Sequence, residues 1–224
     1  MAEKSGIFDM IGPVMVGPSS SHTAGVVRIA RAAIGVLGGT PEDVVITFYN
    51  SFARTYEGHG SDRAIIAGLL NFKTDDDRIK TAFEHAAKHG LSYSFKSVGN
   101  ASTMHPNTIK LDLSKGDRSH TVVGESKGGA VINIAEVDGF SANFSATAHT
   151  LIIKARDTKG SIANIANILS NDNCNIATMS VSRKGKNDIA CLVIEMDSAL
   201  KPISLEYLKN LYWISEVIYI PDID

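Results

Sequence analysis

The sequence of 224 residues predicts an α+β protein with two domains. In the first domain, apolar residues recur at helical spacing early in the chain and later alternate with polar residues, as in half-buried strands. In the second domain, strand and helix patterns follow one another in the order β-α-β-β-α-β. The chain is long enough for two modest domains that each bury a core. We therefore expect a first domain at residues 1–138, a linker at 139–149 and a second domain at 150–224.

The first domain is expected to begin with a helix, because apolar residues recur at helical spacing from Val26 to Leu37 and Gly38-Gly39 then provide a stop. A compact β-branched and aromatic run, Val44–Tyr49, predicts a buried strand. The other elements expected here are a loop at 50–60, a helix at 61–70, a helix that carries residues 79–86 and is ended by Gly90, and strands at 91–95, 109–113, 119–125 and 130–137. This order places helices early and an antiparallel meander late.

The segment between the domains is small and polar, with Phe140 and Phe144 as its only large residues. This composition predicts a linker that docks through the two rings. Beyond it, the sequence predicts strands at 150–155, 175–183, 188–196 and 214–220, and helices at 161–170 and 203–211. That order is typical of the ferredoxin-like split βαβ unit.

Composition excludes several classes of protein. The 22 basic and 24 acidic residues nearly cancel, and no basic cluster with interleaved aromatic residues occurs, so no nucleic-acid partner is expected. No apolar stretch is long enough to span a bilayer, and the first ten residues lack the apolar core of a signal peptide. These features predict a cytoplasmic protein without a membrane partner. Cys174 and Cys191 are too few to hold a typical structural zinc or an iron-sulfur cluster by thiolates alone, and we expect both in the core.

Three consecutive hydroxyls and an imidazole stand where the first helix begins. The first amides of a helix lack intrahelical partners and attract hydroxyl caps, carboxylates or phosphates. A cap needs only one hydroxyl, so the surplus of donors predicts an anion or substrate site; the alternative is a redundant cap beside a surface histidine. The candidate residues are Ser19, Ser20, Ser21, His22 and Thr23.

Two further segments carry candidate histidines. His59 lies between Gly58 and Gly60, which suits an imidazole presented to a ligand or to another protein surface, and equally suits a plain loop. His105 and Asn107 lie in a loop just before a strand. The spacing of these loop histidines and His22 does not indicate a metal site, so no metal ligand is expected on this chain.

The helix that follows His59 begins with Ser61, Asp62 and Arg63. Ser61 suits an N-cap and Asp62 a first-turn acid, so these two residues have a structural explanation without a ligand. Arg63 can grip a carboxylate in bidentate fashion, although a solvated surface arginine is the more common arrangement. A hydrolase triad is not indicated, because no Gly-x-Ser-x-Gly elbow occurs and Ser21 and His22 are sequence neighbours.

In the second domain, the turn Ala155–Gly160 follows a strand and opens a helix, and Asn175 begins the neighbouring strand. Backbone amides at the start of that helix point outwards. The arrangement fits either a small-ligand pocket or an ordinary βα turn.

Four motifs of the first domain together resemble the β chain of the two-chain, iron-sulfur-dependent L-serine dehydratase (L-serine ammonia-lyase) family. These motifs are Gly17–Gly25, Gly58–Ala64, His105-Pro106-Asn107 and Gly124–Gly129. The first domain also resembles the allosteric substrate-binding domain of some phosphoglycerate dehydrogenases. Residues 150–224 resemble an ACT domain, a regulatory fold that often binds amino acids.

The resemblance implies a subunit of a lyase that converts L-serine to pyruvate and ammonia, in amino-acid metabolism and gluconeogenesis. It implies that a separate α chain carries a 4Fe-4S cluster, that iron there holds the substrate while a base removes the α-proton, and that this chain alone is inactive. Ser20, Ser21, His22 and His59 would then position substrate or line the interface with the α chain. Substrate or anion binding would fall to Ser19, Thr23, Arg63, His105 and Asn107.

For the ACT-like domain, the resemblance implies effector binding at Asp157, Gly160 and Asn175 and homodimerisation through sheet edges. Related serine-binding domains place a histidine and an asparagine at the first turn, where this chain has Ala155 and Asp157. The effector is therefore left open. The alternative function is a non-catalytic module that senses an amino acid or an anion and regulates a partner.

Overall fold

The computed structural model describes residues 14–101, 103–186 and 188–223. The first ten residues, from which we expect no signal peptide, lie outside the described residues. The chain divides into two compact units that meet between Asp138 and Gly139, and each unit is described by itself. No helix in the described ranges is both long and apolar enough to cross a membrane.

The first sheet has the strand order β2-β1-β3-β4-β5-β6. Its strands are β1 (Asp43–Tyr49), β2 (Ser92–Val98), β3 (Thr108–Lys115), β4 (Arg118–Gly128), β5 (Val131–Val137) and β6 (Phe140–Phe144). β1 runs parallel to β2 and antiparallel to β3, and β3, β4 and β5 form an antiparallel meander. Apolar side chains such as Ile109, Leu111 and Leu113 alternate with polar ones, so one face of the sheet is buried. The predicted α+β class is confirmed.

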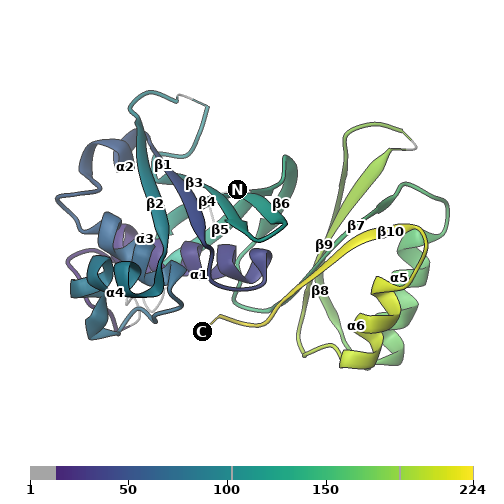
Figure 1. The fold of residues 1–224 in the computed structure, drawn as a ribbon. Coiled ribbons are helices and arrows are strands. Elements are labelled where there is room, and N and C mark those ends of the chain that lie inside the picture. Colours follow the sequence, from purple (N-terminus) through teal and green to yellow (C-terminus); the bar gives the residue numbers. More distant parts are fainter. Residues whose placement is uncertain (1–13, 102, 187, 224) are drawn as a thin grey trace. The chain divides into compact units, whose positions relative to one another are not determined.

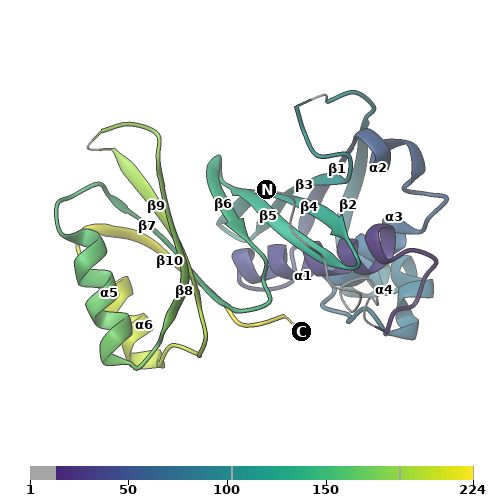
Figure 2. The same ribbon diagram turned by 180° about the vertical axis from the view of Figure 1, so that it is seen from behind.

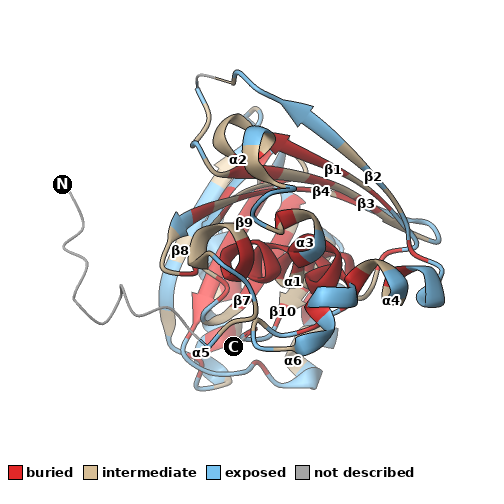
Figure 3. Cartoon of the chain, turned by 90° about the vertical axis from the view of Figure 1, so that its left-hand side faces the viewer, coloured by how far each residue is buried: buried red, intermediate tan, exposed pale blue. Residues whose placement is uncertain are grey.

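Helices cover one face of this sheet in the first unit (Figure 1). They are α1 (Gly25–Leu37), α3 (Ser61–Leu69), the short 3-10 segment η3 (Asp77–Thr81) and α4 (Ala82–His89). α1 is buried along nearly its whole length (Figure 3). It packs closely against α3, since a Cβ on Gly68 would lie 2.5 Å from both the Val27 carbonyl oxygen and the Ala30 Cβ. This close packing places the last turn of α3 against the N-terminal half of α1.

A helix that the sequence did not indicate, α2 (Asn50–Thr55), lies within the segment predicted as a loop. Its six residues are too few to show a helical period. Phe52 is fully buried and its ring meets Phe48 of β1 edge to face, with centroids 6.2 Å apart. Packing, rather than local propensity, therefore stabilises this short helix.

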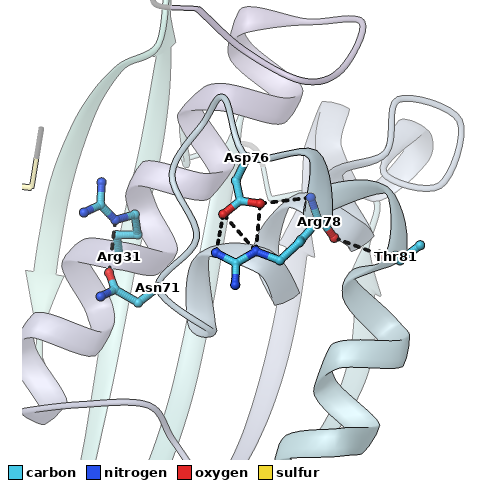
Figure 4. Close-up of polar contacts among 5 residues, drawn as sticks. All are labelled: Arg31, Asn71, Asp76, Arg78 and Thr81. Carbon is cyan, nitrogen blue, oxygen red and sulfur yellow. Dashed lines mark hydrogen bonds and ion pairs between the residues drawn. The ribbon is translucent and has the colours of Figure 1, made fainter.

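The turn after α3 is ordered by polar side chains (Figure 4). Asn71 has a positive φ of 62° and accepts a hydrogen bond from Arg31 Nε at 3.2 Å. Asp76 caps η3 by accepting from the backbone amide and from Nε of Arg78, both at 2.9 Å. Thr81 donates to the Arg78 carbonyl at 3.4 Å.

The second unit has the predicted order β-α-β-β-α-β. After β6, whose residues also fall in this unit, its elements are β7 (His149–Arg156), α5 (Ser161–Asn171), β8 (Ile176–Arg183), β9 (Ile189–Met196), α6 (Pro202–Lys209) and β10 (Ile214–Ile220). The strands form an antiparallel sheet in the order β10-β7-β9-β8, and both helices lie on one face of it (Figure 2). The core between sheet and helices includes Leu151, Ile165, Leu169, Ile194 and Leu208.

The segment 139–149, for which the sequence predicts a linker, contains strand β6. Its burial alternates, with Phe140, Ala142 and Phe144 buried and the two residues between them exposed. This alternation was not recognised as a strand pattern in the sequence, because the segment is short and rich in small polar residues. Within the second unit, Ser180 of β8 donates to the Ala142 carbonyl at 3.4 Å.

Candidate functional site

The serine-rich run forms a short π-helical turn, Ser20–Ala24, that continues directly into α1. Ser19 is extended and caps this turn, because its Oγ accepts the His22 backbone amide at 3.1 Å. The Ser20 and Ser21 hydroxyls, which are half-buried, make no hydrogen bond to any described residue. One hydroxyl thus serves as the cap, and two remain for another acceptor or donor.

The turn is tied to the start of α3 by two side chains. Ser61 Oγ donates to the His22 carbonyl at 2.7 Å and is fully buried. Thr23 Oγ1 donates to the His59 carbonyl at 3.3 Å. The sequence interpretation of Ser61 as an N-cap is wrong: Gly60, with a φ of 70°, is the cap residue and makes no side-chain cap bond. Ser61 lies one residue inside the helix, where its hydroxyl reaches the turn instead.

Ser126 of β4 ties the same turn to the segment that carries His105. Its Oγ donates to the Ser21 carbonyl at 2.9 Å, and its backbone amide donates to the Asn107 carbonyl at 3.0 Å. A Cβ on Gly25 would overlap the Ser126 hydroxyl, so Gly25 is needed for this close approach. The four segments singled out in the sequence therefore meet at one place in the first unit.

The His22 ring lies between two other rings. Its centroid is 4.8 Å from that of Phe52, in an edge-to-face contact, and 4.8 Å from that of His59. Burial and, to a smaller degree, the nearby His59 lower the pKa of His22, so the ring is neutral at pH 7. Nδ1 lies 3.4 Å from Ser19 Oγ, while Nε2 is buried and has no hydrogen-bond partner among the described residues. Such an atom costs about 1–3 kcal/mol unless a bound group satisfies it.

His59 is exposed on its glycine-flanked loop, with Nδ1 3.2 Å from the Thr55 carbonyl. Arg63 is exposed as well, and no contact joins it to the serine-rich turn within the described chain. Burial raises the pKa of Asp62, against the opposing effect of the Arg63 amide hydrogen bond. Arg63 is therefore close to His59 in the sequence, but no contact fixes its side chain beside the serine-rich turn.

The His105 ring is oriented by its own loop. Nδ1 accepts the Asn107 backbone amide at 3.2 Å, so the neutral ring carries its proton on Nε2. Burial, together with the positive charge of Lys127, lowers the pKa of His105, while Glu125 partly opposes this shift. A neutral Nε2–H is a hydrogen-bond donor for an anion.

Glu125 and Lys127 are charged residues of this region that sequence reasoning did not assign to the site. Their side chains form an ion pair at 2.7 Å, and Asn133 Nδ2 lies 3.3 Å from the Glu125 carboxylate. Although burial raises the pKa of Glu125, the hydrogen bonds from Lys127 and Asn133 outweigh it and leave the pKa below its ordinary value. Their position in the Gly124–Gly129 motif is the sequence feature that could have identified them as site residues.

The cysteines do not fit an iron-sulfur cluster on this chain. Both thiols are buried, and both lie in the second unit. Cys174 precedes Ile176, which pairs with Met196 at one end of β9, whereas Cys191 lies roughly 17 Å away along that strand at about 3.3 Å per residue. Two separated thiols cannot ligate one cluster.

The predicted effector residues lie at opposite ends of β8. Asp157 forms an ion pair with Arg183, the last residue of β8, at 2.6 Å. Asn175 precedes the first residue of β8 and donates to the Asp197 carboxylate at 2.6 Å. These ends are roughly 23 Å apart at about 3.3 Å per residue. Gly160 caps α5 with a φ of 84°, on the Asp157 side, so one copy of the chain does not bring the three residues together.

Each end of this sheet has its own cavity. A cavity of about 640 Å³ at the Asp157 end is lined by residues that include Arg156, Asp188 and Trp213. A second, of about 450 Å³, includes Asn175 and Cys174 in its lining. Either volume would hold a small molecule.

Comparison with known proteins shows the family. The family model described as serine dehydratase beta chain matches residues 6–97. The chain is 43% identical to a probable L-serine dehydratase, beta chain, of Bacillus subtilis (strain 168), over 96% of this chain and 98% of that protein. It is 36% identical to the L-serine dehydratase, beta chain, of Peptoniphilus asaccharolyticus, over 91% and 90% of the two chains.

More distant similarities cover parts of other proteins. D-3-phosphoglycerate dehydrogenase of Bacillus subtilis (strain 168) is 30% identical over 75% of this chain and 32% of that protein. A solved ACT domain from GTP pyrophosphokinase of Chlorobium tepidum is 16% identical, with a TM-score of 0.27, and covers 32% of this chain and 94% of that one. The near full-length identities decide the assignment, and this chain belongs to the serine dehydratase β-chain family.

Proposed function

We propose that this chain is the β subunit of an L-serine dehydratase, which converts L-serine to pyruvate and ammonia together with a separate α chain. Support comes from relatives of that name that match nearly the whole chain. The observation that carries the proposal is the meeting of four separate segments around the unpartnered His22 Nε2. The enzyme is expected in the cytoplasm, where its pyruvate would be available to gluconeogenesis.

The iron-sulfur cluster that this family implies is assigned to the α chain, since Cys174 and Cys191 lie too far apart to hold it. Such a cluster supplies a Lewis acid that activates the leaving hydroxyl. The contribution of this chain is limited to its own side chains. We expect the isolated chain to form no pyruvate.

The chain's residues would hold the substrate anion and complete the interface with the α chain. Ser20 and Ser21 offer unpartnered hydroxyls, and neutral His22 and His105 offer ring nitrogens, so together they can bind a carboxylate without a buried cation. Exposed His59 lies against His22, and we assign it to the partner surface or the substrate. The further anion-binding residues proposed are Ser19, Thr23, Arg63 and Asn107.

An assay of the assembled enzyme tests this proposal. The α chain is purified anaerobically with and without this chain, and pyruvate release from L-serine is measured. Full activity of the α chain alone would overturn the proposal and favour a regulatory module. Combined replacement of Ser20, Ser21 and His22 by alanine is expected to abolish turnover, whereas alanine at the exposed His89, Ser92 and Ser94 should leave it unchanged.

For the second unit we propose a homodimer formed through β8, which is an edge strand of its sheet. In an antiparallel pair of β8 strands related by a twofold axis, the end of one strand lies beside the beginning of the other. Asp157 and Gly160 of one copy would then approach Asn175 of the second copy. This arrangement supports an effector site shared between two copies, although one copy alone keeps these residues apart.

A further inference from the structure

The loop between β2 and β3 carries His105, and it lies beside the short helix α2 at the same end of the sheet (Figures 1 and 2). α2 makes hydrogen bonds to this loop at several points. Arg54 Nη1 donates to the Gly99 carbonyl at 3.2 Å, and the Ser51 amide donates to the Pro106 carbonyl at 2.9 Å. The first residue of α2, Asn50, makes the largest number of these bonds.

The Asn50 side chain uses both its oxygen and its nitrogen. Its Oδ1 accepts the Ala101 amide at 2.8 Å, and its Nδ2 donates to the Ala101 carbonyl at 2.9 Å. Nδ2 also lies 3.2 Å from the Met104 carbonyl oxygen and, more distantly, 3.5 Å from that of His105. One amide side chain therefore binds backbone groups at two separate points of the loop, Ala101 and Met104.

The backbone at Asn50 also favours this residue type. Its φ is 51°, in the left-handed region that asparagine and glycine adopt more readily than other residues. Aspartate has the same shape but lacks the Nδ2 donor, and its charge would face carbonyl oxygens. Glycine would adopt the same φ but would lose all the side-chain bonds.

A backbone bond from the Met104 amide to the Ala101 carbonyl, at 2.9 Å, also closes this turn, and the Asn50 side chain ties both of these residues to α2. Beyond them, the His105 carbonyl accepts the Thr108 hydroxyl at 2.7 Å, and its ring is set by the Asn107 amide. The Asn107 carbonyl in turn accepts the Ser126 amide, and Ser126 also holds the serine-rich turn. The loop is thus fixed to α2 on one side and to β4 on the other.

We infer that Asn50 is a positioning residue that holds the loop in the conformation that presents His105 to the anion site. The inference deepens the proposed function and rests on it for the role of His105 in the reaction. The holding of the loop by Asn50 can be tested without that role.

The test uses Asn50→Asp and Asn50→Gly, with Asn71→Asp as the matched control. Asn71 also has a positive φ, but it accepts through Oδ1 from Arg31, and an aspartate can accept the same bond (Figure 4). The full chain is titrated by NMR through its histidine ring signals, with His105 and His22 identified by His→Gln variants. Hydrogen exchange of the amides between residues 99 and 107 is measured in the same samples.

In both Asn50 variants, amide exchange in the loop should accelerate by at least about tenfold, since the Nδ2 bonds that tie the Ala101 and Met104 carbonyls to α2 are lost. The pKa of His105 should rise toward the ordinary value as its ring becomes more exposed, while that of His22 stays unchanged. The assembled enzyme should lose roughly 10- to 100-fold in kcat/KM through misplacement of the ring. Asn71→Asp should behave as the unmodified chain in all three measurements.

Unchanged exchange and an unchanged His105 pKa in Asn50→Asp and Asn50→Gly would overturn the inference. Equal changes at His22 and His105 would also overturn it, because they would indicate general loss of structure. If the pKa of His105 rises in the Asn50 variants while the enzyme keeps full activity, Asn50 does hold the loop. That result would overturn the proposed role of His105 in the reaction.

Discussion

Ser126 of β4 donates its hydroxyl to the backbone carbonyl of Ser21, a residue 105 positions earlier in the chain, at 2.9 Å. Its amide simultaneously donates to the Asn107 carbonyl at 3.0 Å. One residue therefore sets the distance between the serine-rich turn and the loop with His105. The two segments form a single site because of this shared contact.

Replacement of Ser126 by alanine should separate these segments. The variant leaves the half-buried Ser21 carbonyl without its hydroxyl donor, which should lower the free energy of unfolding by about 0.5–1.5 kcal/mol. Urea denaturation of the full chain measures this change, and kcat/KM of the assembled enzyme should fall as well. Ser119→Ala, at an exposed position of the same strand, is the control. Equal stability of the Ser126 and Ser119 variants would contradict the prediction.

Gly25→Ala should destabilise the chain although alanine is the better helix former. The backbone at Gly25 is ordinary helical, with a φ of −60°, so an exposed site of this kind would gain up to about 1 kcal/mol from alanine. Here the added Cβ overlaps the Ser126 hydroxyl. Removing that hydroxyl should make Gly25→Ala less costly, and a double-mutant cycle of unfolding free energies measures the coupling. Strict additivity would show that the two residues do not interact.

Stability should fall as the pH is lowered through the range in which histidines titrate. Burial, aided by His59, holds the pKa of His22 in the folded state below the ordinary value of about 6.5. The unfolded state then binds the proton more readily, so the free energy of unfolding decreases below about pH 6.5 and levels off only below the folded-state pKa. Burial of His105 contributes in the same direction.

His22→Gln should therefore flatten the pH dependence of unfolding between about pH 8 and about pH 5, without removing it. Urea denaturation at several pH values measures the slope. The exposed His89→Gln variant serves as the control and should retain the original slope. A His22→Gln variant with the same slope as the unmodified chain would show that His22 is not the group responsible.

Charge on the free edge of β8 should weaken the proposed dimer. Val181 is 46% exposed on this edge strand, and a lysine there opposes pairing with a second strand. Sedimentation velocity should show Val181→Lys shifted toward monomer, with Ser94→Lys in the first unit unchanged. A chain that is monomeric without any substitution would rule out the β8 dimer.

Long periodic segments could be predicted from the sequence because burial of one face demands a regular pattern. The helix from Gly25 to Leu37, the alternation of Ile109, Leu111 and Leu113, and the order of strands and helices in the second unit all follow from such periods. The density of hydroxyls and imidazoles also identified the turn around His22 as a candidate site. These properties depend on residues close together in the chain.

Only the tertiary structure decided which segments meet. α2 and β6 are too short to show a period, and packing of Phe52 and Phe144 produces them. The role of Ser61 changed from a local cap to a contact with His22 because the partner lies 39 positions away. Likewise, the separation of Asp157 from Asn175 follows from the length of β8. Contacts between distant residues depend on how the chain folds back on itself, and the sequence near each residue does not determine which distant residue it will contact.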